Sequence, residues 1–196
     1  EGYSSIALNK DAKGATVTAT NTTINLTGSA CSDSKKAKVD AEGASITING
    51  STADVKITVA YISYGDTYYS FETLEAAIEK AQAGETVVLI KDVTLSEILT
   101  INKSITLDGN VHTLTSNAAR AINVVGENEV TIKNLTINAS GERAINIIQN
   151  ATNVTIENVK ATAANYTVNV AGSAKGATVT IKDSELTGLN AVNVAG

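Results

Sequence analysis

A tandem repeat constrains this chain more than any other feature of its sequence. The stretch RAINVVGENEVTIKN, from Arg120 to Asn134, returns as RAINIIQNATNVTIEN, from Arg143 to Asn158. One apolar–Thr–apolar triplet recurs at steps of 25, 24 and 25 residues, and its four copies start at Ile105, Val130, Val154 and Val179. Such a period is typical of stacked architectures, because one unit cannot bury its own apolar face.

Each repeat contains at least two segments in which apolar and polar residues alternate, the pattern of a β-strand. The second segment reads AINV, AINI, TVNV and AVNV, and its copies start at Ala121, Ala144, Thr167 and Ala191. A residue that tolerates a tight turn follows the first segment in every unit, namely Gly109, Asn134, Asn158 and Asp183. Short strands closed by tight turns, with a period of about 24 residues, predict a parallel β-helix.

Stacked coils place equivalent residues in rows about 4.8 Å apart. We expect two apolar rows to fill the core: Ile105, Val130, Val154, Val179 and Leu107, Ile132, Ile156, Ile181. Between them we expect an outward row of Thr106, Thr131, Thr155 and Thr180. The next outward row alternates in sign, with Asp108, Lys133, Glu157 and Lys182. A slip in register would therefore set like charges side by side.

A row of asparagines recurs in the second segment, at Asn123, Asn146, Asn169 and Asn193. Two arrangements are open. The amides either lie inside and bond one another as stacked asparagine ladders do, or they face solvent. The alternating apolar neighbours favour the solvent-facing arrangement. Both arrangements make the row a structural feature.

The segment 71–83 has helical rather than strand periodicity, since its apolar residues are Leu74, Ala77, Ile78 and Ala81. We expect Ser70 to cap the start of this helix and Gly84 to end it. An amphipathic helix of this kind would cover the open first coil, whose unpaired strand edges otherwise invite association.

The stretch LEAAIEKAQAGETVVLIKDVTL, followed by LTINKSITLDGNVHTLTSN, resembles the N-terminal cap and first coils of right-handed parallel β-helix proteins related to pectate lyases. It is most similar to β-helix modules of large bacterial cell-surface proteins. The resemblance covers 67–196 and implies an all-β domain with an N-terminal capping helix, located extracellularly or at the cell surface. It fixes no activity, because this fold carries lyases, hydrolases, tailspikes and adhesins alike.

Residues 1–66 contain strand-like runs separated by Gly, Ser, Asn and Asp. They predict a small β-rich segment before the β-helix. Two forms are open, a separate sandwich-like domain and divergent coils, and we favour the separate domain.

Lyases of the resembled fold use an acidic cluster that binds calcium and an Arg or Lys base. The only arginines here, Arg120 and Arg143, occupy equivalent positions in adjacent repeats, where Tyr166 follows in the next repeat. With Glu142 beside them, these residues are candidate contacts for an anionic sugar, and the alternative is an ordinary solvated surface. A single histidine, His112, excludes a multi-His metal site. We therefore expect no catalytic residue, metal or cofactor.

The net charge and the hydropathy of the chain limit the classes of partner that it can bind. The net charge of −5 and the lack of any Lys/Arg cluster beyond the short group Lys35, Lys36 and Lys38 argue against a nucleic-acid partner. No apolar run approaches the ~20 residues of a membrane helix, so we expect no direct membrane insertion. We expect a non-catalytic secreted or surface module, acting as stalk, adhesin or scaffold, that meets glycans or neighbouring cell-surface molecules. The alternative is a polysaccharide lyase, glycosidase or glycan-binding module.

The last repeat matches the others through Asn193, with no atypical terminal unit after it. Terminal repeats normally differ because they shield the stack. We therefore expect either further coils or another molecule on this edge, including end-to-end self-association.

Overall fold

A computed structural model describes residues 7–8, 14–19, 38–39, 45–48, 51–52, 56–57, 59–64 and 67–195. The chain divides into two compact units, Glu1–Val59 and Ala60–Gly196. Each unit is described by itself.

The first unit contains six short strands among its described residues. β1 (Ala7–Leu8), β3 (Lys38–Val39) and β6 (Lys56–Ile57) form one parallel sheet. A second sheet contains β2 (Thr16–Ala19), β4 (Ser45–Ile48) and β5 (Ser51–Thr52). Because most of 1–66 lies outside the described residues, the choice between a sandwich-like domain and divergent coils stays a prediction.

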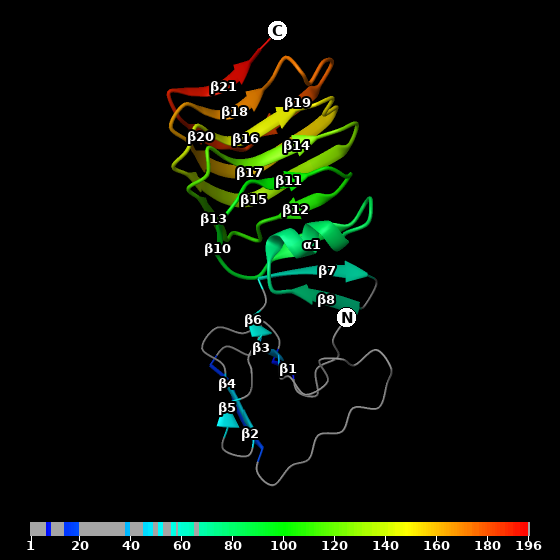
Figure 1. Ribbon diagram of the computed structural model, residues 1–196, viewed down its shortest axis with the longest axis vertical. Coiled ribbons are helices and arrows are strands. Elements are labelled where there is room, and N and C mark those ends of the chain that lie inside the picture. The colour runs from blue at the N-terminus through cyan, green and yellow to red at the C-terminus, as the bar shows by residue number, and fades with distance from the viewer. Residues whose placement is uncertain are drawn as a thin grey trace. The chain divides into compact units, whose positions relative to one another are not determined.

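The second unit is a parallel β-solenoid of about five turns, and its coils stack from α1 to β21 in Figure 1. Each coil has three strand segments. The first side contains β9 (Thr86–Leu89), β12 (Thr106–Asp108), the starts of β15 (Glu129–Ala139) and β17 (Asn153–Thr162), and β19 (Thr178–Lys182). The second contains β10 (Val93–Leu95), β13 (Thr113–Ser116), the ends of β15 and β17, and β20 (Glu185–Thr187). The third contains β11 (Leu99–Ile101), β14 (Arg120–Val125), β16 (Arg143–Ile148), β18 (Tyr166–Val170) and β21 (Asn190–Val194).

The register confirms the expected rows. Thr106, Thr131, Thr155 and Thr180 are partners in successive coils, and Thr86 extends their row into the first coil. The apolar residues that flank them are buried in the inner coils, where Leu107, Ile132 and Ile156 have no exposed surface. Burying one such side chain contributes about 1.5–3 kcal/mol. The core is therefore a continuous stack of branched residues through the coils.

The turn after the first strand is made in two ways. Asn134, Asn158 and Asp183 adopt left-handed backbone with φ of 50°, 50° and 51°, as expected. Gly109 does not, and the second coil instead places φ of 47° and 64° on Asn110 and Val111. A Cβ on Gly109 would lie 2.6 Å from the backbone oxygen of Asn134. Glycine is required at 109 for close approach to the next coil, not for positive φ.

The capping helix is shorter than predicted. α1 spans Leu74–Lys80, and its N-cap is Thr73, whose side chain accepts a bond of 3.1 Å from the Ala76 amide. The expectation that Ser70 caps the helix is wrong, because Ser70 lies in β8 (Thr67–Phe71). Leu74, Ala77 and Ile78 are buried, and α1 packs against β7 (Ala60–Tyr64), β9 and β11.

A hairpin closes the first coil beside α1. β7 pairs antiparallel with β9 on one side and with β8 on the other. Ala60 and Ile62 of β7 are buried at 0% and 4% exposure. The exposed edge that the first coil would otherwise present is thus paired by residues that precede position 67.

We predict that a chain starting at Ala60 folds cooperatively, whereas one starting at Thr67 is less stable. The shorter chain leaves the edge of β9 unpaired and removes Ile62, whose burial alone contributes about 1.5–3 kcal/mol. Thermal unfolding followed by circular dichroism, with size-exclusion chromatography for aggregation, compares the two. Equal midpoints would show that β7 adds nothing to the solenoid.

Candidate functional site: polar ladders and an arginine pair

The asparagine row forms a continuous side-chain ladder. Nδ2 of Asn146 donates to Oδ1 of Asn123 at 2.9 Å, Asn169 donates to Asn146 at 2.8 Å, and Asn193 donates to Asn169 at 2.7 Å. Asn146 and Asn169 are only 2% and 5% exposed. The favoured solvent-facing arrangement is therefore wrong for these two residues, and the stacked arrangement is confirmed.

Burial of these amides is tolerated because the stack satisfies them. Each inner amide uses Nδ2 as donor toward the preceding coil and Oδ1 as acceptor toward the next. A satisfied hydrogen bond contributes about 0.5–1.5 kcal/mol, whereas a buried group left unpaired costs about 1–3 kcal/mol. The ladder therefore stabilises one register, because a slip of either strand would leave buried amides without hydrogen-bond partners.

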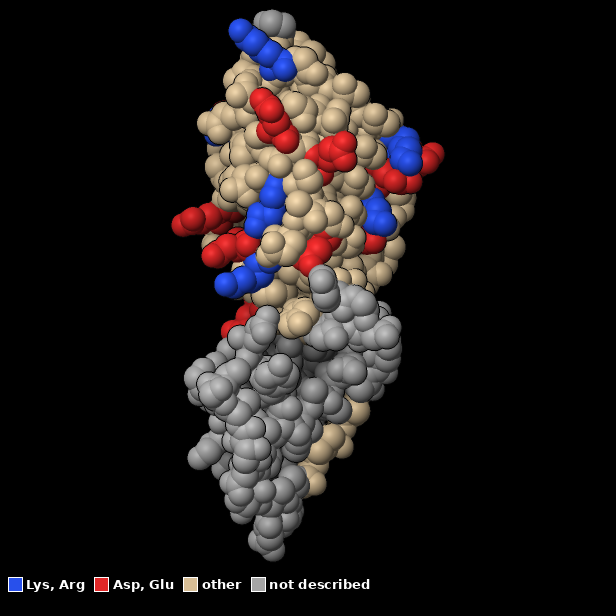
Figure 2. Space-filling model, turned by 90° about the vertical axis from the view of Figure 1, so that its right-hand side faces the viewer, with Lys and Arg blue, Asp and Glu red and all other residues tan. Residues whose placement is uncertain are grey.

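Charged rows add to the same register on the surface. Lys133 Nζ lies 3.4 Å from Asp108 Oδ2, and Lys182 Nζ lies 2.9 Å from Glu157 Oε1. These two pairs confirm the alternation of sign that the sequence predicts. Side chains of both signs are interspersed on the face of the second unit shown in Figure 2. Since exposed pairs contribute only about 0–1 kcal/mol each, their role is to disfavour wrong registers.

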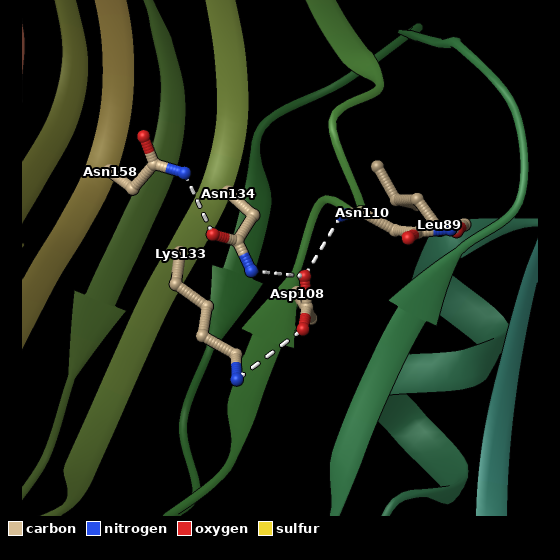
Figure 3. Close-up of polar contacts among 6 residues, drawn as sticks. All are labelled: Leu89, Asp108, Asn110, Lys133, Asn134 and Asn158. Atoms are coloured by element: carbon tan, nitrogen blue, oxygen red, sulfur yellow. Dashed lines mark hydrogen bonds and ion pairs between the residues drawn. The ribbon is translucent and has the colours of Figure 1, made fainter.

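A second ladder runs along the turn between the first and second sides (Figure 3). Asp108 Oδ1 accepts bonds from the Asn110 amide at 2.9 Å and from Asn134 Nδ2 at 3.1 Å. Asn134 Oδ1 accepts from Asn158 Nδ2 at 2.9 Å. Nδ2 of Asn110 reaches back to the Leu89 carbonyl at 3.2 Å. Side chains at this corner therefore link four successive coils.

The four candidate ligand contacts lie together. Arg120, Arg143 and Tyr166 are partners in successive coils, so the register places them in one row. Cζ of Arg143 lies 5.8 Å from the centre of the Tyr166 ring, and its Nη2 lies 3.9 Å from Glu142 Oε2. Nε of Arg143 is buried without a hydrogen-bond partner. Arg120 makes no ion pair within the part of the chain that the structure describes.

This arrangement places a partly exposed guanidinium where it can bind a negatively charged group. The Arg143 side chain is 21% exposed, and its guanidinium lies over the Tyr166 ring. Among the described residues, no three His, Cys, Asp or Glu side chains gather closely enough to hold a metal. The register predicts the row, but the stacking of Arg143 on Tyr166 and the unpaired Nε have no signal in the sequence.

The chain matches no protein-family model, no curated protein and no solved structure. No helix among the described residues is long and apolar enough to span a membrane.

Replacing Asn146 with alanine should destabilise the protein more than the same change at Asn193. Asn146→Ala breaks two ladder bonds and leaves Asn123 Oδ1 and Asn169 Nδ2 unpaired, so we expect a loss of about 2–4 kcal/mol. Asn193→Ala breaks one bond at a half-buried position and serves as the matched control. Urea unfolding measures both. Equal losses would mean that the ladder does not act as a connected chain.

Proposed function

We propose that this protein is a non-catalytic β-solenoid module that acts as a rigid spacer or scaffold in a secreted or cell-surface protein. The observation that carries the proposal is the continuity of the two polar ladders. One links Asn123 to Asn193, and the other links Asp108 to Asn158. Both run along the stacking direction.

Every coil is tied to the next by backbone pairing on three sides and by these side-chain bonds. Parallel strands lie about 4.8 Å apart, so the number of coils sets the length of the stack in fixed increments. Because neighbouring repeats carry nearly all the contacts, a solenoid can change length by whole repeats without a new fold. These properties suit a stalk that holds other parts of a protein at a set distance.

Removing one coil tests the spacer function directly. Deleting residues 134–157 joins Lys133 to Asn158, which occupies the position equivalent to Asn134. The same variant carries Lys182→Glu, because the deletion would otherwise place Lys182 beside Lys133. The expected product unfolds cooperatively, and its ends lie one strand spacing closer, by about 4.8 Å. In a Cys31→Ser background, spin labels at Glu79 and Leu189, both on the surface, report this distance by pulsed electron paramagnetic resonance. Loss of folding, or an unchanged distance, would contradict the proposal.

A second candidate function, glycan binding, is favoured by Arg143 alone. This side chain is mostly buried, its ion pair with Glu142 is long, and its guanidinium covers an aromatic ring. Arginine binds carboxylates through charge-assisted, often paired hydrogen bonds. A uronate or another acidic sugar carries such a carboxylate.

Binding of polygalacturonate and of sialylated oligosaccharides, measured with and without calcium, distinguishes the two functions. If the row binds acidic glycans, Arg143→Ala should weaken binding at least tenfold by calorimetry, whereas Lys175→Ala, an exposed cation elsewhere, should not. Absence of binding removes the second candidate. Turnover of a glycan that is lost in Arg143→Ala would overturn the non-catalytic assignment.

A further inference from the structure

Two arginines depart from the charge pattern that the rest of the solenoid follows. Within its described strands, four register pairs join a cation to an anion: Asp108–Lys133, Lys133–Glu157, Glu157–Lys182 and Lys160–Glu185. Arg120 and Arg143 are also register partners, and they join two cations. Like charges at opposed positions of neighbouring strands are destabilising. A position that breaks a rule kept by its neighbours is a candidate for a functional site.

The described part of the protein does not neutralise this pair. There, the Arg120 side chain makes no hydrogen bond and no ion pair. Nη2 of Arg143 lies 3.9 Å from Glu142 Oε2, which is too long for a hydrogen bond, and its Nε is buried without a partner. Because each guanidinium carries five N–H donors, the pair has hydrogen-bonding capacity that these residues leave unused.

The backbone holds the two side chains at a fixed spacing. Arg143 N donates to the Ala119 carbonyl at 3.2 Å, and Tyr166 N donates to the Glu142 carbonyl at 2.9 Å, so the turns before this row are stacked. Gly141 allows the close stacking, since a Cβ there would overlap the backbone of the preceding coil. The two arginines therefore start from one row at adjacent levels, about 4.8 Å apart.

We propose that Arg120 and Arg143 together bind one phosphate monoester of a phosphorylated glycan. The proposal rests on the glycan-binding candidate above and adds Arg120 to it, which changes the preferred anion. A phosphate monoester carries a charge of about −1.5 to −2 at pH 7 and three acceptor oxygens. These oxygens do not lie in one plane, so guanidiniums at two levels can donate to the same group. A carboxylate has one charge and two oxygens, which a single guanidinium fork already satisfies.

Glu142 lowers the affinity of this site for an anion. Its side chain is 52% exposed, and its carboxylate lies beside Nη2 of Arg143, where it repels a second negative charge. The 3.9 Å separation leaves it without a hydrogen bond to the guanidinium, so it can turn toward solvent when a ligand arrives. Replacing it with glutamine removes the repulsion and should therefore strengthen binding.

Three glucose derivatives that differ only in the acidic group at the last carbon test the proposal by calorimetry. Glucose 6-phosphate should bind roughly tenfold or more tightly than glucuronate, and glucose 6-sulfate, which has three oxygens but one charge, should fall between them. Arg120→Gln should abolish the preference for phosphate, because one guanidinium then remains. Glu142→Gln should tighten phosphate binding, and Lys175→Ala, at an exposed position elsewhere, should leave it unchanged.

The outcomes separate this inference from the glycan-binding candidate. Glucuronate binding that depends on Arg143 but not on Arg120, with no preference for phosphate, would leave glycan binding standing and overturn the shared site. A preference for phosphate that survives Arg120→Gln would overturn it as well. If none of the three sugars binds, both proposals fall. Arg143→Gln affects a mostly buried side chain, so Arg120→Gln carries the test if the former does not fold, as judged by circular dichroism.

Discussion

In-register parallel pairing of adjacent coils is the constraint on which the rest of the structure depends. In the part of the chain that the structure describes, every strand of an inner coil pairs with the equivalent strands of the coils before and after it. Each side chain therefore lies beside its own equivalents, about 4.8 Å away. A row can contain only residues that tolerate this: branched apolar side chains in the core, threonines on the surface, amides that bond one another, and charges that alternate in sign.

This constraint explains why much of the fold could be predicted from the sequence. The rows follow from a strand period of two and a repeat of about 24 residues, and both can be counted along the chain. Whether the Asn146 side chain is buried or faces solvent could not be predicted from these two periods. Alternation shows which face of a strand a residue shares with its neighbours, but burial of an amide depends on whether another amide meets it. That is a property of the stack.

Other differences between prediction and structure depend on pairing and on rotamers, which residue patterns do not determine. Ser70 has a suitable side chain for a helix cap, but pairing of Tyr61 with Ser70 holds that residue in β8, and the helix starts after Thr73 instead. For the candidate ligand row, register placed Arg120 and Arg143 together, whereas the stacking of Arg143 on Tyr166 depends on rotamers. Sequence patterns fix rows more readily than they fix what side chains do within a row.

The asparagine ladder gives the stack a direction. All three bonds have the donor in the later coil and the acceptor in the earlier one, so the ladder begins at Asn123 and offers its last acceptor at Asn193. The covered end, under β7 and α1, presents no free strand edge on β9, while the end at β21 presents both an unpaired strand and exposed valines. At the other end the outermost strand of the sheet is β8, which pairs with β7. Because Oδ1 of Asn193 is an acceptor in the same position as Oδ1 of Asn123, Asn146 and Asn169, the ladder could take the amide of one more coil without any change in its geometry.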